Sequence, residues 1–126
     1  MKMSNKNLKK YKKEILRLSE KRQKLLQLLL SNQLLVLGSY TETRMRCSSP
    51  GCHCHKDGGH PTMRISHWCE GKLKSKVVRI DDRQWVAEAA ANYKAHKQAL
   101  RDIAEVNNRE KEVLKLIIEQ KAQIYE

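Results

Sequence analysis

Apolar residues recur at steps of three and four positions in the first third of the chain, where residues 4–37 contain neither Gly nor Pro. The stripe consists of Leu8, Tyr11, Ile15, Leu18, Leu25 and Leu29, with Arg22 in its one polar slot. This spacing predicts a long helix with a coiled-coil seam, and Ser4 is its expected N-cap. After Leu25 the leucines spread around the helix, so we expect burial on several faces and an end at Gly38.

A second long helix is predicted over residues 81–126, which also lack Gly and Pro. Asp81 and Asp82 supply capping carboxylates after the apolar Ile80, which is expected to act as a staple. The apolar stripe of this helix is interrupted by the polar residues Asn107, Glu110 and Lys121. Because a polar residue at a seam position often fixes the register or oligomeric state of a coiled coil, we expect these interruptions to have that role.

The region between the helices predicts short strands and turns. Alternating polar and apolar positions indicate strands over residues 40–47, 62–69 and 73–80. Glu70-Gly71 is a hairpin signal, and the segments 48–51 and 56–59 are rich in turn formers. The expected fold is mainly α with a small β element, in which two long, coiled-coil-like helices flank a central β-hairpin module. The expected segments are the N-terminal helix, the central module and the C-terminal helix, at residues 1–38, 39–80 and 81–126.

The composition limits what such a chain does. Of the 126 residues, 40% are apolar and 5% aromatic, and Phe is absent, which leaves little material for a large core. An enzyme with a deep substrate pocket is therefore not expected. No apolar run reaches the roughly 18 residues of a membrane span. No apolar stretch follows the first residues to act as a secretory signal, so we expect a cytoplasmic protein.

Cysteine and histidine cluster in the central segment, where all four cysteines and four of the five histidines lie between residues 47 and 69. In a reducing compartment, such clustering favours metal binding over disulfides. The pattern C-x4-C-x-C, followed by a histidine, provides four nitrogen and sulfur ligands, the set that zinc prefers. We expect one structural Zn²⁺ ion, which makes the central segment a zinc-binding module. The expected ligands are Cys47, Cys52, Cys54 and His60.

Other roles for these residues stay open. Cys69 and His55 are alternative fourth ligands, although a cysteine on a strand is more often a small buried apolar residue. Cys52 and Cys54 lack the C-x-x-C spacing of a redox pair. No general base in a known motif accompanies the site, so we expect no catalysis and no catalytic residues. A regulator whose zinc site senses oxidation is a weaker interpretation, supported by Cys69 alone.

Residues 38–107 contain the motifs Arg46-Cys47, Pro50-Gly51-Cys52-His53-Cys54, His60-Pro61, Gly71-Lys72, Trp85-Val86 and Asn92-Tyr93-Lys94. Together these motifs resemble those of a family of small uncharacterised prokaryotic proteins. The resemblance implies a zinc-ribbon-like module flanked by long helices, often encoded near transposases and other mobile elements. Two features differ: His60-Pro61 replaces the usual H-G-P, and Met63-Arg64-Ile65 replaces a tyrosine-rich stretch, which removes side chains suited to stacking.

Basic residues dominate the first part of the chain. The net charge is +12, and residues 1–46 carry 12 basic against 3 acidic side chains. Such a cluster favours phosphate backbones through counterion release, while a solvated helix face is the competing interpretation. We expect Trp68 to pack in the core rather than stack on a base. The expected nucleic-acid contacts are Lys9, Lys10, Lys12, Lys13, Arg17, Lys21, Arg44, Arg46, Arg64, Lys72, Lys74 and Lys76.

Two functions fit these observations. In the first, the protein is a non-enzymatic, zinc-stabilised nucleic-acid-binding accessory protein. It then binds the phosphate backbone of DNA, and its expected partner is a transposase or a CRISPR-type defence nuclease. In the second, it is an adaptor whose coiled coil bridges copies of a larger enzyme without binding nucleic acid itself. A homodimer fits both functions.

Overall fold

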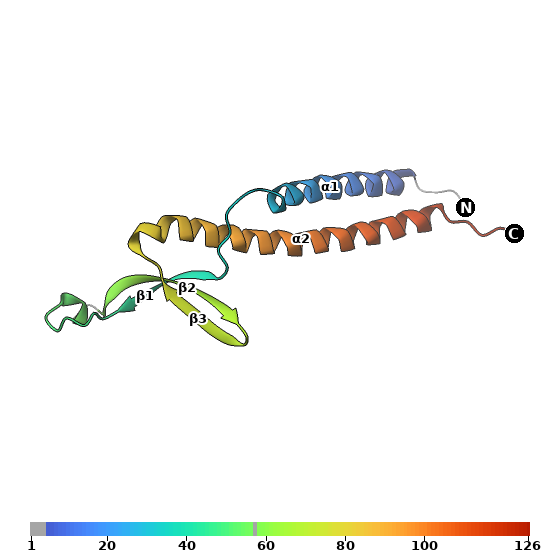
Figure 1. Ribbon diagram of the computed structural model, residues 1–126. Coiled ribbons are helices and arrows are strands. Elements are labelled where there is room, and N and C mark those ends of the chain that lie inside the picture. The colour runs from blue at the N-terminus through green and yellow to red at the C-terminus, as the bar shows by residue number, and fades with distance from the viewer. Residues whose placement is uncertain (1–4, 57) are drawn as a thin grey trace. The chain divides into compact units, whose positions relative to one another are not determined.

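The computed structural model describes residues 5–56 and 58–126, apart from the side chains of residues 5, 6 and 54. Ser4, Asp57 and the Cys54 side chain, which carry expectations from the sequence, lie outside these parts. The elements are α1 (Asn5–Leu29), β1 (Ser39–Met45), the short 3-10 helix η1 (His53–His55), β2 (His60–Cys69), β3 (Lys72–Val77), the 3-10 helix η2 (Ile80–Asp82) and α2 (Arg83–Lys121) (Figure 1). The chain is mainly helical with a small three-stranded antiparallel sheet, which confirms the expected class.

The chain divides into two compact units. The first, which we call the helical arm, comprises residues 1–31 and 96–126, and it contains α1 and most of α2. The second, which we call the sheet unit, comprises residues 32–95, and it contains the three strands and the first turns of α2. Within the described residues, no helix is both long and apolar enough to cross a membrane.

The helical arm buries a thin apolar core and pairs its polar seam residues. Its buried side chains are Leu18, Ala99, Val106 and Val113. Arg22, the polar residue in the apolar stripe of α1, contacts two polar residues in the stripe of α2. Its Nε donates to Asn107 Oδ1 at 3.0 Å, and its guanidinium binds the Glu110 carboxylate. Because Arg22 pairs with two of the three polar interruptions of the second stripe, Asn107 and Glu110, these residues help to define how the helices align.

The first helix ends earlier than its apolar residues predict. α1 stops at Leu29, so the expected helix to Leu37 is wrong. Residues 32–37 instead run extended against the start of α2, where Val36 N–H donates to the Ala89 carbonyl at 3.1 Å and Asn92 Nδ2 donates to the Leu34 carbonyl at 3.4 Å. The late leucines are largely exposed rather than buried on several faces, at 79% for Leu30 and 64% for Leu34.

Gly38 has a different role from the expected helix cap. Its φ of +118° is a conformation that L side chains rarely adopt. A Cβ atom at this position would lie 2.3 Å from the Ser66 carbonyl oxygen. The glycine therefore lets the chain enter the sheet in close contact with the backbone of β2.

The three strands form an antiparallel sheet in the order β1-β2-β3 (Figure 1). Cys69 pairs with Lys72, so Glu70-Gly71 is a two-residue turn, as the sequence predicts. Both turn residues have positive φ, +52° for Glu70 and +78° for Gly71, which is the signature of a type I′ hairpin turn. The hairpin register is thus fixed by the shortest common connection.

The two faces of the sheet carry different side chains. Side chains alternate along a strand, and Arg64 pairs with Thr41 on one side and Val77 on the other. The face that includes Arg64, which we call the Trp68 face, carries Met45, Arg64, Ser66, Trp68, Leu73, Ser75 and Val77. The opposite face carries Tyr40, Arg44, Met63, Ile65, His67, Lys72, Lys74 and Lys76.

The apolar side chains of the Trp68 face are not buried in a core. They are exposed, at 72% for Trp68, 57% for Leu73 and 48% for Val77. The expected core position of Trp68 is therefore wrong, because the two-residue period of the strand gives the opposite face to Met63 and Ile65. The buried core of the sheet unit consists of Val78, Val86, Ala89 and Ala90.

The entry into α2 differs in detail from the expectation. η2 precedes the helix, which begins at Arg83. Ile80, the expected staple, is 76% exposed. The Asp82 carboxylate accepts a hydrogen bond from the Trp85 indole Nε1 at 2.9 Å. The acid therefore serves to hold an aromatic ring one turn further along.

Candidate metal centre

Strand pairing brings the first and last members of the predicted ligand set together. His60 opens β2 directly opposite Met45, the last residue of β1, and Cys47 follows two residues later. Gly59 makes this approach possible, because it has a φ of +111° and a Cβ atom there would lie 2.7 Å from the Met45 backbone. Gly58 also has positive φ, so the predicted reversal before His60 is confirmed.

A tight turn supplies the next ligand. Pro50 and Gly51 form a turn, as expected, after which Cys52 N–H donates to the Ser49 carbonyl at 3.2 Å. The chain then enters η1, where Lys56 N–H donates to the His53 carbonyl at 3.0 Å. These local hydrogen bonds return the chain and direct the Cys52 side chain towards the start of β2.

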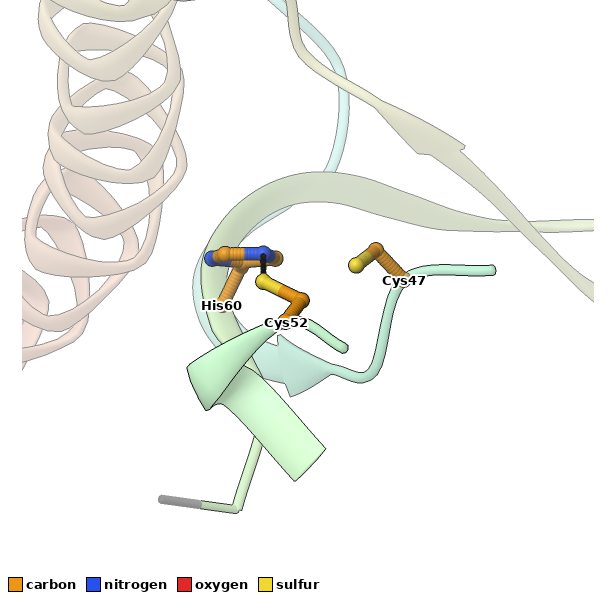
Figure 2. A group of neighbouring side chains, drawn as sticks. All are labelled: Cys47, Cys52 and His60. Atoms are coloured by element: carbon orange, nitrogen blue, oxygen red, sulfur yellow. Dashed lines mark hydrogen bonds between the residues drawn. The ribbon is translucent and has the colours of Figure 1, made fainter. Parts of the chain in front are cut away.

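The side chains of Cys47, Cys52 and His60 point towards one another (Figure 2). Their ligand atoms all lie within 4.8 Å of one another, and Cys52 Sγ lies 3.2 Å from His60 Nε2. Bond lengths of about 2.3 Å to sulfur and 2.0–2.1 Å to nitrogen separate neighbouring ligands of a tetrahedral zinc by roughly 3.5 Å. The three residues are half-buried and are able to hold a metal ion with little rearrangement.

Several groups around this trio are relevant to a fourth ligand. The His53 ring meets the His60 ring edge-on, with centroids 5.6 Å apart. His55 Nε2 is buried and has no hydrogen-bond partner among the described residues, so His55 stays an alternative ligand. Cys54, the predicted ligand, follows Cys52 by two residues, and its side chain lies outside the described part.

Cys69 is too far away to be the fourth ligand. It ends β2, whereas His60 begins it. At about 3.3 Å per residue, nine steps along a strand separate the two residues by roughly 30 Å. The alternative that uses Cys69 is therefore wrong, and the oxidation-sensing interpretation loses its only support.

The predicted nucleic-acid contacts of the first helix are all exposed. Lys10, Lys13, Arg17 and Lys21 follow steps of three and four, so they share one side of α1. Lys24 extends this line by one more step, and we call these five residues the basic row. Lys9 and Lys12 lie elsewhere around the helix. The site prediction omitted Lys24, which helical spacing alone would have included.

The predicted contacts of the central module do not form one surface. Arg44, Lys72, Lys74 and Lys76 share the face opposite Trp68 and are exposed. Arg64 lies on the Trp68 face, where its Nε donates to Ser75 Oγ at 2.9 Å. Arg46 follows β1 and is exposed. The alternation of β2 and β3 was visible in the sequence and would have separated these two sets.

Fold and site together define the class: a mainly helical protein with a small antiparallel sheet and a Cys/His group able to hold a metal ion. The chain belongs to the family described as a domain of unknown function, DUF6788, which it matches over residues 9–88. The matched region includes most of α1, all three strands and the Cys/His group. No curated protein and no solved structure matches the chain at a significant level.

Proposed function

We propose that the protein is a non-enzymatic nucleic-acid-binding protein that acts as a homodimer and is stabilised by one Zn²⁺ ion. The zinc ligands in this proposal are Cys47, Cys52, Cys54 and His60. The first two cysteines and the histidine already converge within 4.8 Å, and soft thiolates with imidazole suit zinc. Four protein ligands leave no open position for a reacting water, so the metal supplies folding energy and no chemistry.

The observation that carries nucleic-acid binding is the basic row of α1. Its five side chains are exposed, and its four lysines form no salt bridge with any residue that the structure describes. From Lys10 to Lys24 the row extends about 21 Å, over which B-DNA presents about twelve phosphate charges. A line of exposed positive charge with this length favours a polyanion over a small ligand.

The acids of the arm do not compensate this row. Glu14 binds Arg109 from the other helix, with Arg109 Nε 2.7 Å from Glu14 Oε1. Glu110 of α2 binds Arg22 in the same way. Arg17 is 3.9 Å from Glu14 and keeps 75% of its side chain exposed. Glu14 and Glu110 thus bind chiefly across the two helices, and Glu14 offsets only part of the charge of the row through its longer contact with Arg17.

The test is the anisotropy of labelled nucleic acids across a salt series, with a matched pair of variants. Replacing Lys10, Lys13 and Lys21 by Gln removes three charges from the row. Replacing the exposed Lys111, Lys115 and Lys121 of α2 removes the same charge elsewhere. We expect only the first variant to lose about 2.7 from the slope of log affinity against log salt on duplex DNA, since each phosphate contact contributes about 0.9. Equal losses, or no binding by the unaltered protein at low salt, would reject the proposal.

The homodimer is supported by an apolar groove in the helical arm. The groove has a volume of about 350 Å³ and is lined by Lys12, Ile15, Leu16, Leu114 and Ile117. Leu16 is 66% exposed and Leu114 43%, and Ile118 beside them is 61% exposed. Because each helix of the arm exposes apolar residues on this side, a second arm would complete a four-helix arrangement of ordinary type.

Sedimentation velocity tests this interface. Leu114→Lys introduces a charge at the groove and is expected to convert a dimer to a monomer, whereas Leu30→Lys, at a residue 79% exposed outside the groove, is expected to leave the dimer intact. A monomeric unaltered protein would contradict the dimer. The groove would then favour the second candidate function, an adaptor that docks on a larger protein.

A further inference from the structure

We propose that the Trp68 face of the sheet binds single-stranded nucleic acid, with an unpaired base stacked on the Trp68 indole. This inference deepens the proposed function and rests on it. It concerns a different surface from the basic row, because the row belongs to the helical arm and Trp68 to the sheet unit. The two surfaces are therefore open to separate tests.

The position of Trp68 is well defined by the hairpin. It pairs with Leu73 across β2 and β3, one residue before the type I′ turn reverses the chain. The indole is 72% exposed and Leu73 is 57% exposed, so both present apolar surface to solvent. A large aromatic side chain held on a rigid strand and left open to water is a preformed platform for stacking.

Polar side chains beside the platform are held in order. Ser75 Oγ accepts a hydrogen bond from Arg64 Nε at 2.9 Å and lies 2.9 Å from Ser66 Oγ. Arg64 Nη1 lies 3.3 Å from Met45 Sδ, which fixes the guanidinium across the face. An arginine has five N–H donors, so this arrangement leaves donors for a phosphate or a base edge. The guanidinium plane is itself a second surface for stacking.

Charge selects nucleic acid as the occupant. Across the three strands and their connecting loops, residues 39–77 contain seven basic side chains and three acidic ones. Arg64 supplies a positive charge on the Trp68 face itself, whereas Lys72, Lys74 and Lys76 are exposed on the opposite face of β3, which is an outer strand of the sheet. Because β3 lies at the edge, the long, flexible lysine side chains are able to reach round it to a backbone that passes the platform. Exposed aromatic and basic groups together are the usual basis of single-strand binding.

Single strands fit this surface better than duplexes do. A base offers its flat side to a protein only when it is unstacked, which single strands and loops permit and a regular duplex does not. The Trp68 face is a sheet with short side chains between its aromatic and its arginine, not a helix sized for the major groove. We therefore assign the row to phosphates of either form and Trp68 to unpaired bases.

The experiment uses the zinc-loaded full chain with Trp85 replaced by Phe, so that Trp68 is the single tryptophan and is excited selectively over the tyrosines. Titration with oligo(dT) and oligo(U) is expected to quench its emission, and a hairpin duplex of equal length is not. Trp68→Ala, made in the unaltered chain, is expected to weaken single-strand affinity about 5- to 150-fold, the range of one stacked base. Its duplex affinity and single-strand salt slope are expected to stay unchanged, and Trp68→Phe is expected to restore part of the loss.

The outcomes separate this inference from the proposed function. Absence of all nucleic-acid binding would reject both. Salt-dependent binding that depends on the basic row, but is unchanged by Trp68→Ala, would reject the stacking site alone. A Trp68→Ala variant that alters the sedimentation of the protein without changing single-strand affinity would assign the face to a protein contact and overturn the inference. Because Trp68 is largely exposed, its replacement is expected to preserve the fold, which circular dichroism verifies.

Discussion

The helical arm and the sheet unit hold their structures by different means. In the arm, contacts recur along two long helices, with apolar residues buried at several levels and ion pairs at two others. Among the described residues, the buried side chains of the sheet unit are Val78, Val86, Ala89 and Ala90. So small a core does not stabilise a sheet of this size alone. The helical arm is thus stabilised by contacts that repeat along two helices, whereas the sheet unit depends on a few positions such as the Cys/His group and Gly38.

The largest expected effect comes from breaking the metal group of the sheet unit. Cys52→Ser is expected to abolish zinc binding and unfold the sheet unit, leaving helical arms that aggregate. Structural zinc contributes about 10–16 kcal/mol of apparent binding energy in zinc-finger peptides, which is as large as the whole stability of many domains. Hydrogen exchange is expected to show lost protection in β1 and β2, with protection in α1 and α2 reduced far less.

Cys69→Ser is the matched control, because it removes a thiol from the same sheet far from the Cys/His group. It is expected to bind one zinc per chain and to keep the strands protected. A stable, monodisperse, zinc-free Cys52→Ser protein with protected strands would show that the sheet unit needs no metal.

An intermediate effect is expected from Gly38→Ala, which disturbs the backbone of the sheet unit. The added Cβ would lie 2.3 Å from the Ser66 carbonyl, at a φ of +118° that alanine avoids. We expect a loss of at least about 2 kcal/mol in unfolding free energy, measured by urea denaturation with tryptophan fluorescence as the probe. Gly51→Ala is the control, because among the described residues no atom beyond its two chain neighbours lies within 4 Å of the added Cβ. Equal stability of the two variants would contradict the close approach.

The smallest expected effect concerns pH and the helical arm. The hydrogen bond from Arg109 lowers the pKa of Glu14 below its ordinary value of 4.5. Burial opposes this shift more strongly than any single neighbouring charge supports it, and the charges of Arg109, Arg17 and Lys10 add to the lowering. The stabilisation is therefore complete above the ordinary pKa and is lost as the pH falls through the lowered value. Because Arg109 remains 47% exposed, the effect is modest.

Helical circular dichroism at several pH values measures this contribution. Glu14→Gln is expected to lower the melting temperature at neutral pH and to flatten its fall below pH 4.5. Glu105→Gln, at an exposed carboxylate on α2, is expected to leave the pH profile unchanged. Identical profiles for Glu14→Gln and the unaltered protein would show that the Glu14–Arg109 pair does not stabilise the helical arm.

The sequence predicted the parts of the fold that local patterns control. The hairpin turn followed from Gly71, because a two-residue loop demands positive φ and glycine adopts it freely. The positive φ of Glu70 was not predictable from its residue type. The polar residues Arg22, Asn107 and Glu110 were visible as interruptions of two apolar stripes. Their pairing with each other was not predicted, since spacing within one helix carries no information about the partner helix.

The failures have physical causes too. The leucines after Leu29 have high helix propensity, but residues 32–37 gain hydrogen bonds to α2 by running extended, and tertiary contacts override propensity. Trp68 was expected in the core because large aromatic residues usually lie there. The face of the sheet on which Trp68 lies depends on the strand register, because a shift of one residue would move the side chain to the opposite face. In the candidate site, the sequence identified Cys47, Cys52 and His60, and only the strand length separated Cys69 from them.

The lysines of β3 also affect how readily the sheet associates with other copies of itself. In the described sheet β3 is an outer strand, and its free edge is a template on which another copy could add a strand. Lys72, Lys74 and Lys76 occupy every second position along that edge. Edge-to-edge addition of an identical strand would bring ammonium groups together and force them to lose water. The lysines thus oppose fibrous aggregation of a hairpin whose other face exposes Trp68, Leu73 and Val77.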